Sequence, residues 1–135
     1  MGDVEKSLLL VSRIQSILLS EGIDCALIGG YALIYNNVSR TTEDVDVGVF
    51  NADFYMRVYV HLKFLKAEGY KLTYHSPEDG DVLGGMLTIT HEDIYPIEIV
   101  NLCPQPMYVG MPHAGRLSIK DPMIFDLDGH ELMGL

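Results

Sequence analysis

The stretch that decides the fold is Ile28-Gly29-Gly30, followed after thirteen residues by Asp44-Val45-Asp46-Val47. Side chains alternate between the two faces of a strand, so Asp44 and Asp46 are expected on one face, with the valines directed into a core. Two carboxylates at such neighbouring positions repel each other unless a cation lies between them. Because Mg²⁺ and other hard divalent cations accept ligand sets made of oxygen alone, the pair predicts a metal site.

The two glycines stand at the end of a short apolar run, residues 23–28, which is typical of a buried strand. Gly29-Gly30 is expected to end this strand and to open a short helix over residues 31–35. Backbone N–H groups at the start of a helix attract phosphate, and glycine lets a phosphate approach the backbone closely. The sequence therefore predicts phosphate binding by one element and metal binding by another, which is the equipment of phosphoryl or nucleotidyl transfer.

A third acid, Glu98, lies between two isoleucines in a later predicted strand. On one interpretation of this pattern, Glu98 simply faces solvent at the edge of a sheet. On the other, Glu98 joins Asp44 and Asp46 on one face of the sheet and completes a two-metal site. The sequence alone leaves both interpretations open.

Helices and strands are expected to alternate around this core. Helices are predicted where apolar residues recur at helical spacing, and strands where β-branched residues cluster. The first and last helices are expected to stop at Gly22 and Gly69, and Pro96 is expected at the start or edge of its strand. The final fifteen residues are mixed in character, with room for one short helix. The predicted helices span residues 8–18, 31–35 and 54–68, and the predicted strands span residues 23–28, 45–50, 70–74, 86–90 and 94–102.

This order predicts an α/β (α+β) domain in which helices flank a mixed, mostly antiparallel sheet. The length of 135 residues fits a single domain over residues 1–135. Its 19 acidic residues against 9 basic ones give a net charge of −10, which argues against a protein that coats nucleic acid nonspecifically.

The cysteine content and the apolar runs bear on the location of the protein. Two cysteines are too few for the disulfide framework of a secreted domain. The sequence shows neither a signal peptide nor an apolar run long enough to span a bilayer, so we expect a cytoplasmic protein with no membrane partner. A hydrophobic content of 48% favours an oligomer or a face that binds a partner.

Three segments together resemble the nucleotidyltransferase superfamily, whose catalytic core is of the polymerase-beta type. They are Gly29-Gly30, the run Arg-Thr-Thr-Glu-Asp-Val-Asp over residues 40–46, and Ile97-Glu98-Ile99. The resemblance is strongest over residues 23–102. The Arg-x-Thr-x-Asp-hydrophobic-Asp form is similar to minimal bacterial-type members, among them toxins of toxin–antitoxin systems and small antibiotic nucleotidyltransferases.

The resemblance implies a minimal nucleotidyltransferase fold and a two-metal mechanism. Mg²⁺ or Mn²⁺ is the implied metal, and a nucleoside triphosphate such as ATP is the implied substrate. Asp44, Asp46 and Glu98 would be the catalytic residues and the metal ligands. Glu98 would also lower the pKa of the acceptor hydroxyl or take its proton directly.

The resemblance also implies a set of nucleotide-binding residues. Gly29 and Gly30 would hold the phosphates. Arg40 would contact a phosphate or a carboxylate, and the Thr42 hydroxyl would brace the turn at Asp44 by a hydrogen bond. The expected reaction moves a nucleoside monophosphate to a hydroxyl acceptor, which the sequence leaves open between tRNA, a protein and a small molecule.

Basic residues are scarce after Leu102, where larger members of the superfamily carry nucleotide-binding cations. Only Arg116 and Lys120 are found there. We therefore expect a second copy of the chain or a partner protein to help hold the substrates. The alternative is a non-catalytic binding or regulatory module with the same fold, such as a toxin–antitoxin component.

Overall fold

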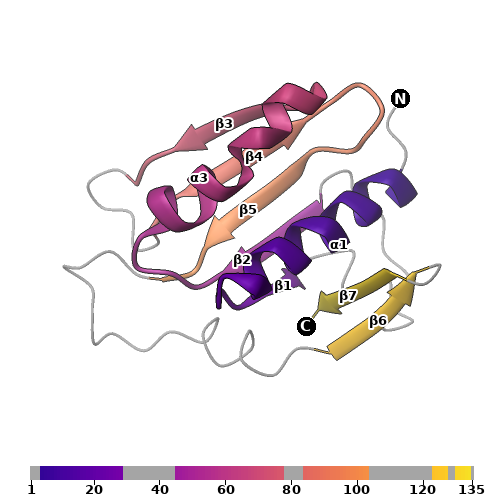
Figure 1. Ribbon diagram of the computed structural model, residues 1–135, viewed down its shortest axis with the longest axis horizontal. Helices are drawn as coiled ribbons and strands as arrows, with labels where there is room; N and C mark the ends of the chain where they lie inside the picture. Colours follow the sequence, from indigo (N-terminus) through magenta and orange to yellow (C-terminus); the bar gives the residue numbers. More distant parts are fainter. Residues whose placement is uncertain (1–3, 29–44, 78–83, 104–122, 128–129, 135) are drawn as a thin grey trace.

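The computed structural model describes residues 4–28, 45–77, 84–103, 123–127 and 130–134 (Figure 1). Their strands form one seven-stranded sheet in the order β3-β4-β5-β2-β1-β7-β6. The pairs β1–β7 and β2–β5 are parallel, and the other four neighbouring pairs are antiparallel. The strands are β1 (Cys25–Ile28), β2 (Val45–Val49), β3 (Lys71–His75), β4 (Met86–Thr90), β5 (Ile97–Asn101), β6 (Met123–Leu127) and β7 (His130–Gly134). The predicted mixed, mostly antiparallel sheet is confirmed.

Two helical segments lie on the same face of this sheet (Figure 1). The first is α1 (Val4–Ser20), which packs against β1, β2 and β7. The second runs through three geometries in succession: the π-helical η1 (Tyr55–Tyr59), the α-helical α3 (Val60–Leu62) and the 3₁₀-helical η2 (Lys63–Glu68). In the described part of the chain, none of the helices combines the length and the apolar character needed to cross a bilayer.

The hydrophobic core lies between the two helical segments and the sheet. Along β2, β4 and β5 the buried side chains come at every second residue, because alternate residues of a strand point to opposite faces. The helices contribute a stripe of buried residues to the same cluster. Core residues with no solvent exposure include Val11, Ile14, Leu18, Val45, Val47, Val49, Val58, Leu62, Leu65, Leu87, Ile89, Ile97 and Ile99.

Both helical segments end at the predicted glycines. Gly22 has a φ of 74° and Gly69 a φ of 97°, in the left-handed region that glycine adopts without strain. After α1, the N–H of Gly22 donates to the Leu19 carbonyl and the N–H of Ile23 donates to the Leu18 carbonyl. These paired bonds form a Schellman motif, in which the buried Leu18 and Ile23 make the usual apolar contact. The sequence prediction of both helix ends is confirmed.

The predicted strand over residues 94–102 is shorter in the structure, where β5 begins at Ile97. Pro96 has no N–H to donate to a neighbouring strand, and it lies directly before β5 as predicted. The N–H of Ile94 instead donates to the His91 carbonyl, which closes a turn over residues 91–94. The Pro96 carbonyl accepts a hydrogen bond from the N–H of Val45, so the start of β5 is tied to the start of β2.

The C-terminal segment differs from the prediction of a short helix. Residues 123–127 and 130–134 form the antiparallel strands β6 and β7, with Leu127 and His130 as register partners. The sequence signal was Asp128-Gly129, a dipeptide favoured in two-residue hairpin turns. The charged residues Asp126 and Glu131 interrupt the apolar pattern of both strands and conceal it. The helix predicted over residues 31–35 lies outside the described residues.

Asn101 is a buried amide that joins three segments, and its loss is expected to destabilise the fold. Its side chain is 2% exposed. It accepts hydrogen bonds from the N–H groups of Asn51 (3.2 Å) and Cys103 (3.1 Å) and donates to the Asn51 carbonyl (2.9 Å). Asn101→Ala leaves these half-buried backbone groups without their partner, so we expect the free energy of unfolding to fall by about 1–3 kcal/mol in urea titrations. The exposed Thr73→Ala should change it by less than about 0.5 kcal/mol, and an equal loss in both variants would contradict the assignment.

Candidate active site

Asp46 and Glu98 come together across two neighbouring strands. They are register partners in the parallel pair β2–β5, and neighbouring strands lie about 4.8 Å apart. Both residues are half-buried, while the valines and isoleucines on either side of them are fully buried against the helices. Because side chains alternate along a strand, Asp46 and Glu98 share the face of the sheet opposite the helices. Of the two interpretations that the sequence left open for Glu98, the structure supports the one in which it joins Asp46.

A row of register partners extends from this pair in both directions. Ile28 of β1 pairs with Asp46, Thr88 of β4 pairs with Glu98, and Thr73 of β3 pairs with Thr88. Register partners present their side chains on the same face of a sheet. We call the surface formed by Ile28, Asp46, Glu98, Thr88 and Thr73 the carboxylate face.

The two threonines of the carboxylate face were missed by the sequence analysis. Thr88 lies beside Glu98 and brings a hydroxyl, which both donates and accepts hydrogen bonds, to the edge of the candidate site. The alternation of β4 could have revealed it, since Leu87 and Ile89 are fully buried and Thr88 between them is half-buried. That alternation assigns a face, but the sequence carried no indication that β4 pairs with β5.

This chain is similar to known proteins in its structure. No known protein family matches the sequence, and no curated protein matches it. Several solved structures do match, including the following two. The aminoglycoside nucleotidyltransferase ANT(2'')-Ia in complex with adenylyl-2''-tobramycin is 11% identical, with a TM-score of 0.54 over 96% of this chain and 68% of that one. An antigenic nucleotidyltransferase-like protein from Paracoccidioides brasiliensis is 16% identical, with a TM-score of 0.53 over 97% of this chain and 62% of that one.

The chain has a nucleotidyltransferase fold. At these identities the likeness concerns the fold and not the individual residues. The chain also spans less than two thirds of the Paracoccidioides protein. The fold prediction made from the glycine pair and the three acids is therefore confirmed.

Five of the predicted site residues lie outside the described residues: Gly29, Gly30, Arg40, Thr42 and Asp44. The chain positions next to them are nevertheless informative. Ile28, which precedes Gly29, is the register partner of Asp46, and Val45, which follows Asp44, is the register partner of Ile97. The segment over residues 29–44 therefore follows β1, which lies beside Asp46, and precedes β2, which contains Asp46.

The described carboxylates fit a divalent metal of the kind the nucleotidyltransferase fold implies. Asp46 and Glu98 offer only oxygen donors, which Mg²⁺ and Mn²⁺ accept. Like charges on neighbouring strands repel, and a cation between them removes that repulsion. Within residues 4–28, 45–77, 84–103, 123–127 and 130–134, no group of three metal-ligating side chains is found. The full set with Asp44 therefore stays a prediction.

Cys25 is a buried thiol on β1 of the same sheet, but it is not a candidate nucleophile. It is 1% exposed, and burial, with a smaller contribution from the charge of Asp24, raises the pKa of the thiol to about 12. A thiol reacts as its thiolate. We therefore expect a disulfide reagent at neutral pH to modify Cys103 in the folded protein, and Cys25 only after unfolding in denaturant. The Cys103→Ser variant should then show no reaction when folded, and fast labelling of Cys25 in that variant would contradict the prediction.

Proposed function

We propose that this protein transfers a nucleoside monophosphate from a nucleoside triphosphate to a hydroxyl acceptor in the cytoplasm. The observation that carries the proposal is the register pairing of Asp46 with Glu98 on the carboxylate face of a nucleotidyltransferase fold. Two carboxylates on a rigid pair of strands are the residue type and the placement that metal-dependent phosphate chemistry requires. Of the two fold neighbours, one is a nucleotidyltransferase and the other is described as nucleotidyltransferase-like.

In this proposal Asp44, Asp46 and Glu98 hold Mg²⁺ or Mn²⁺. When bound, the metal neutralises charge on the triphosphate and makes an acceptor hydroxyl more acidic. Glu98 lies at the edge of the pair nearest to Thr88, where it accepts the proton of the acceptor hydroxyl. The acceptor oxygen forms a bond to the α-phosphorus, the bond between the α-phosphorus and the bridging oxygen breaks, and pyrophosphate leaves.

The segment from Gly29 to Asp44 supplies the nucleotide contacts in this proposal. Gly29 and Gly30 hold the phosphates, Arg40 contacts a phosphate or a carboxylate, and Thr42 braces Asp44. These assignments follow from the resemblance of this segment to the superfamily motif and from the position of Ile28 beside Asp46. A triphosphate that reaches Asp46 would lie next to the end of β1.

The net charge of the protein favours one class of hydroxyl acceptor over another. A net charge of −10 repels a polyanion such as tRNA, so an uncharged or cationic hydroxyl compound is favoured over RNA. The fold neighbour ANT(2'')-Ia was solved with adenylyl-2''-tobramycin, which makes small hydroxyl compounds the first acceptors to test. Protein hydroxyls and tRNA form the second and third groups of acceptors.

The test is a transfer assay with each of the four nucleoside triphosphates, radiolabelled at the α-phosphate. The protein is incubated with Mg²⁺ or Mn²⁺ and an acceptor panel of aminoglycosides, lincosamides, a protein mixture and tRNA. We expect pyrophosphate release and a labelled acceptor that both disappear when a chelator removes the metal. Absence of metal-dependent triphosphate binding and of transfer to every acceptor would overturn the proposal.

A non-catalytic binding module is the second candidate function, and one observation favours it. Large apolar side chains are exposed on the two helical segments, including Leu19 (46%), Tyr55 (45%), Met56 (55%) and Phe64 (40%). Exposed apolar residues of this size are common at protein–protein interfaces. This alternative predicts a second copy or a partner protein on the helical layer, and it predicts that triphosphate binds without turnover. Size-exclusion chromatography with light scattering, performed beside the transfer assay, separates the two functions.

A further inference from the structure

A shallow hollow opens at one end of the sheet, where β3 begins and β4 ends. Its volume is about 490 Å³, which is within the range of small-molecule sites. We call it the β3–β4 hollow, and it is lined by Gly69, Lys71, Thr90, His91 and Glu92. None of these five residues has a role in the proposed transfer.

The β3–β4 hollow continues the surface on which Glu98 lies. Thr88 is the register partner of Glu98, on a strand about 4.8 Å away. Thr90 follows Thr88 by two residues on β4, so its side chain lies on the same side of the sheet, about 7 Å further along the strand. Lys71 is the register partner of Thr90 and shares that side. Two half-buried hydroxyls, those of Thr88 and Thr90, therefore lead from Glu98 to the hollow.

Two charged side chains of opposite sign line the β3–β4 hollow. Lys71 is exposed at the start of β3, and Glu92 is exposed in the turn after β4. Within the part of the chain that the structure describes, neither forms an ion pair with a group of opposite charge. The ammonium of Lys71 therefore offers hydrogen-bond donors to a ligand, and the carboxylate of Glu92 offers acceptors. With its histidine neutral, the hollow is polar without a net charge.

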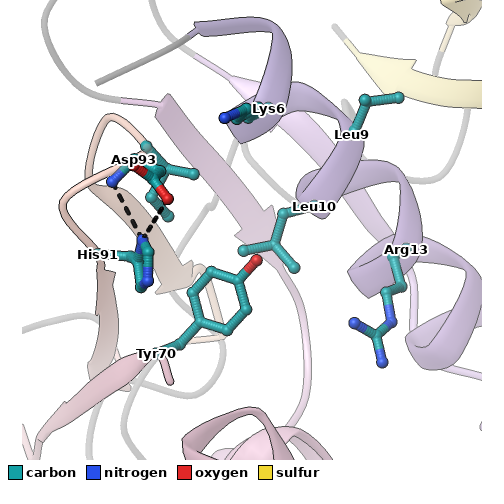
Figure 2. Close-up of a pocket in the computed structure, with 8 residues that line it drawn as sticks. Lys6, Leu9, Leu10, Arg13, Tyr70, His91 and Asp93 are labelled. Carbon is teal, nitrogen blue, oxygen red and sulfur yellow. Dashed lines mark hydrogen bonds and ion pairs between the residues drawn. The ribbon is translucent and has the colours of Figure 1, made fainter. Parts of the chain in front are cut away.

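His91 brings a further donor to the β3–β4 hollow in a fixed position. Its Nδ1 accepts a hydrogen bond of 3.0 Å from the N–H of Asp93, so in the neutral ring the proton is on Nε2. The Nε2 edge lies beside Gly69, where an added Cβ would be 3.8 Å away, and the missing side chain leaves room next to this donor. The ring also packs against Tyr70, with centroids 5.2 Å apart, and lines a separate hollow beside α1 with Tyr70 and Lys6 (Figure 2). The imidazole is thus held before a ligand binds, which lowers the cost of ordering it.

The polar groups between Glu98 and the β3–β4 hollow suit a compound that carries many hydroxyl groups. A hydroxyl both donates and accepts hydrogen bonds, and the side chains of Thr88 and Thr90 do the same. The hollow adds an ammonium and an imidazole as donors and one carboxylate as an acceptor. Once Asp46 and Glu98 hold a metal, no net charge is left among the described side chains of this surface. A charged ligand would lose its hydration there without gaining a counter-charge, so an uncharged ligand is favoured.

We propose that the acceptor of the transfer is an uncharged polyhydroxyl compound of the sugar class, which binds over Thr88 and Thr90 and extends into the β3–β4 hollow. Its reacting hydroxyl lies at Glu98, and its other hydroxyls exchange hydrogen bonds with the two threonines, Lys71 and Glu92. This inference rests on the proposed transfer and narrows its acceptor from any hydroxyl compound to an uncharged one. Aminoglycosides, whose amino groups are positively charged, are then poorer acceptors than sugars without amino groups.

The transfer assay tests this inference with two sets of acceptors. Glucose, maltose and trehalose are the uncharged sugars, and glucosamine, kanamycin and tobramycin are the amino sugars. We expect kcat/KM to be at least about tenfold higher for the best uncharged sugar than for any amino sugar. In titrations followed by backbone amide NMR, which need no turnover, the same uncharged sugar should shift the signals of Lys71, Thr88 and Thr90.

Variants of single hydroxyl groups locate the acceptor on the sheet. Thr88→Val removes one hydroxyl at nearly constant size, so the KM for the sugar should rise by about tenfold while the KM for the triphosphate stays unchanged. Thr88→Ser keeps the hydroxyl and should restore the parent KM. Tyr74→Phe is the matched control, because it removes a hydroxyl from β3 on the helix-bearing side, where Tyr74 packs against Phe54 and Tyr55. It should leave both constants at the parent values.

The outcomes separate this inference from the proposed function. Failure of metal-dependent triphosphate binding and of transfer to every acceptor overturns the proposed function, and the acceptor assignment with it. Transfer only to amino sugars, to protein or to tRNA overturns the acceptor class alone. Transfer to an uncharged sugar with an unchanged KM in Thr88→Val, or with an equal rise in Tyr74→Phe, overturns the location of the acceptor on β4. Amide shifts at Thr88 and Thr90 without any transfer would retain the sugar site and overturn the enzyme proposal.

Discussion

Replacing Asp46 by Asn is expected to lower the rate of metal-dependent triphosphate turnover by at least about a hundredfold. The amide keeps the size of the side chain but removes the negative charge that holds a divalent cation. Asp46 is half-buried on β2 and in register with Glu98, so its carboxylate has a fixed position in the proposed metal site. The measurement is the initial rate of pyrophosphate release at saturating triphosphate and metal.

Three further variants make this result interpretable. Glu98→Gln should cause a loss of similar size, and the double variant should lose little more than either single one, because residues that hold one metal site act as a unit. Asp24→Asn, at an exposed position before β1, is the matched control and should retain the parent rate. A rate within about twofold of the parent for Asp46→Asn would contradict the enzyme proposal and favour the binding module.

Replacing Ile99 by Ala is expected to lower the free energy of unfolding by about 2–5 kcal/mol. Ile99 has no solvent exposure and is in register with Val47 on β2 and with Leu87 on β4, at the centre of the core. The truncation leaves a cavity among residues that belong to three neighbouring strands. Since a domain of this size is stable by only about 5–15 kcal/mol, the loss should be plain in the midpoint of urea unfolding.

Leu19→Ala is the control for Ile99→Ala. Leu19 lies on α1 and is 46% exposed, so the same kind of truncation removes little buried surface. Alanine also favours helix, and we expect a change of less than about 0.5 kcal/mol. If Ile99→Ala were as stable as Leu19→Ala, the face assignment of β5 would be wrong, and with it the placement of Glu98 on the opposite face.

Local sequence signals were sufficient for much of the fold. The apolar spacing of α1, the β-branched runs of β2 and β4, and the glycines at positions 22 and 69 each act within a few residues, so they can be recognised without knowing the tertiary structure. Alternation also assigned Asp46 and Glu98 to strand positions between buried neighbours. Strand order is a long-range property, and nothing in the sequence indicated that β5 would pair in parallel with β2 or that β7 would pair with β1.

The candidate site could be predicted only in part for the same reason. Asp46 and Glu98 were recognised by residue type and local pattern, whereas Thr88 and Thr73 belong to the carboxylate face only because of strand pairing. The hollow lined by Lys6, Tyr70 and His91 is further from any local signal, since it combines Lys6 with residues more than sixty positions away along the chain. Contacts between such distant segments follow from the packing of α1 on the sheet.

The pairing of Ser7 with Tyr95 also constrains how the chain folds. These residues are 88 positions apart, yet their two hydrogen bonds fix the first helix to the turn before β5. Contacts of such large sequence separation form late, because a long loop must close before they stabilise anything. During synthesis α1 therefore leaves the ribosome well before the surface that receives it exists. Its apolar stripe, which includes Val11 and Ile14, is exposed in that interval, and exposed apolar surface of this kind favours aggregation.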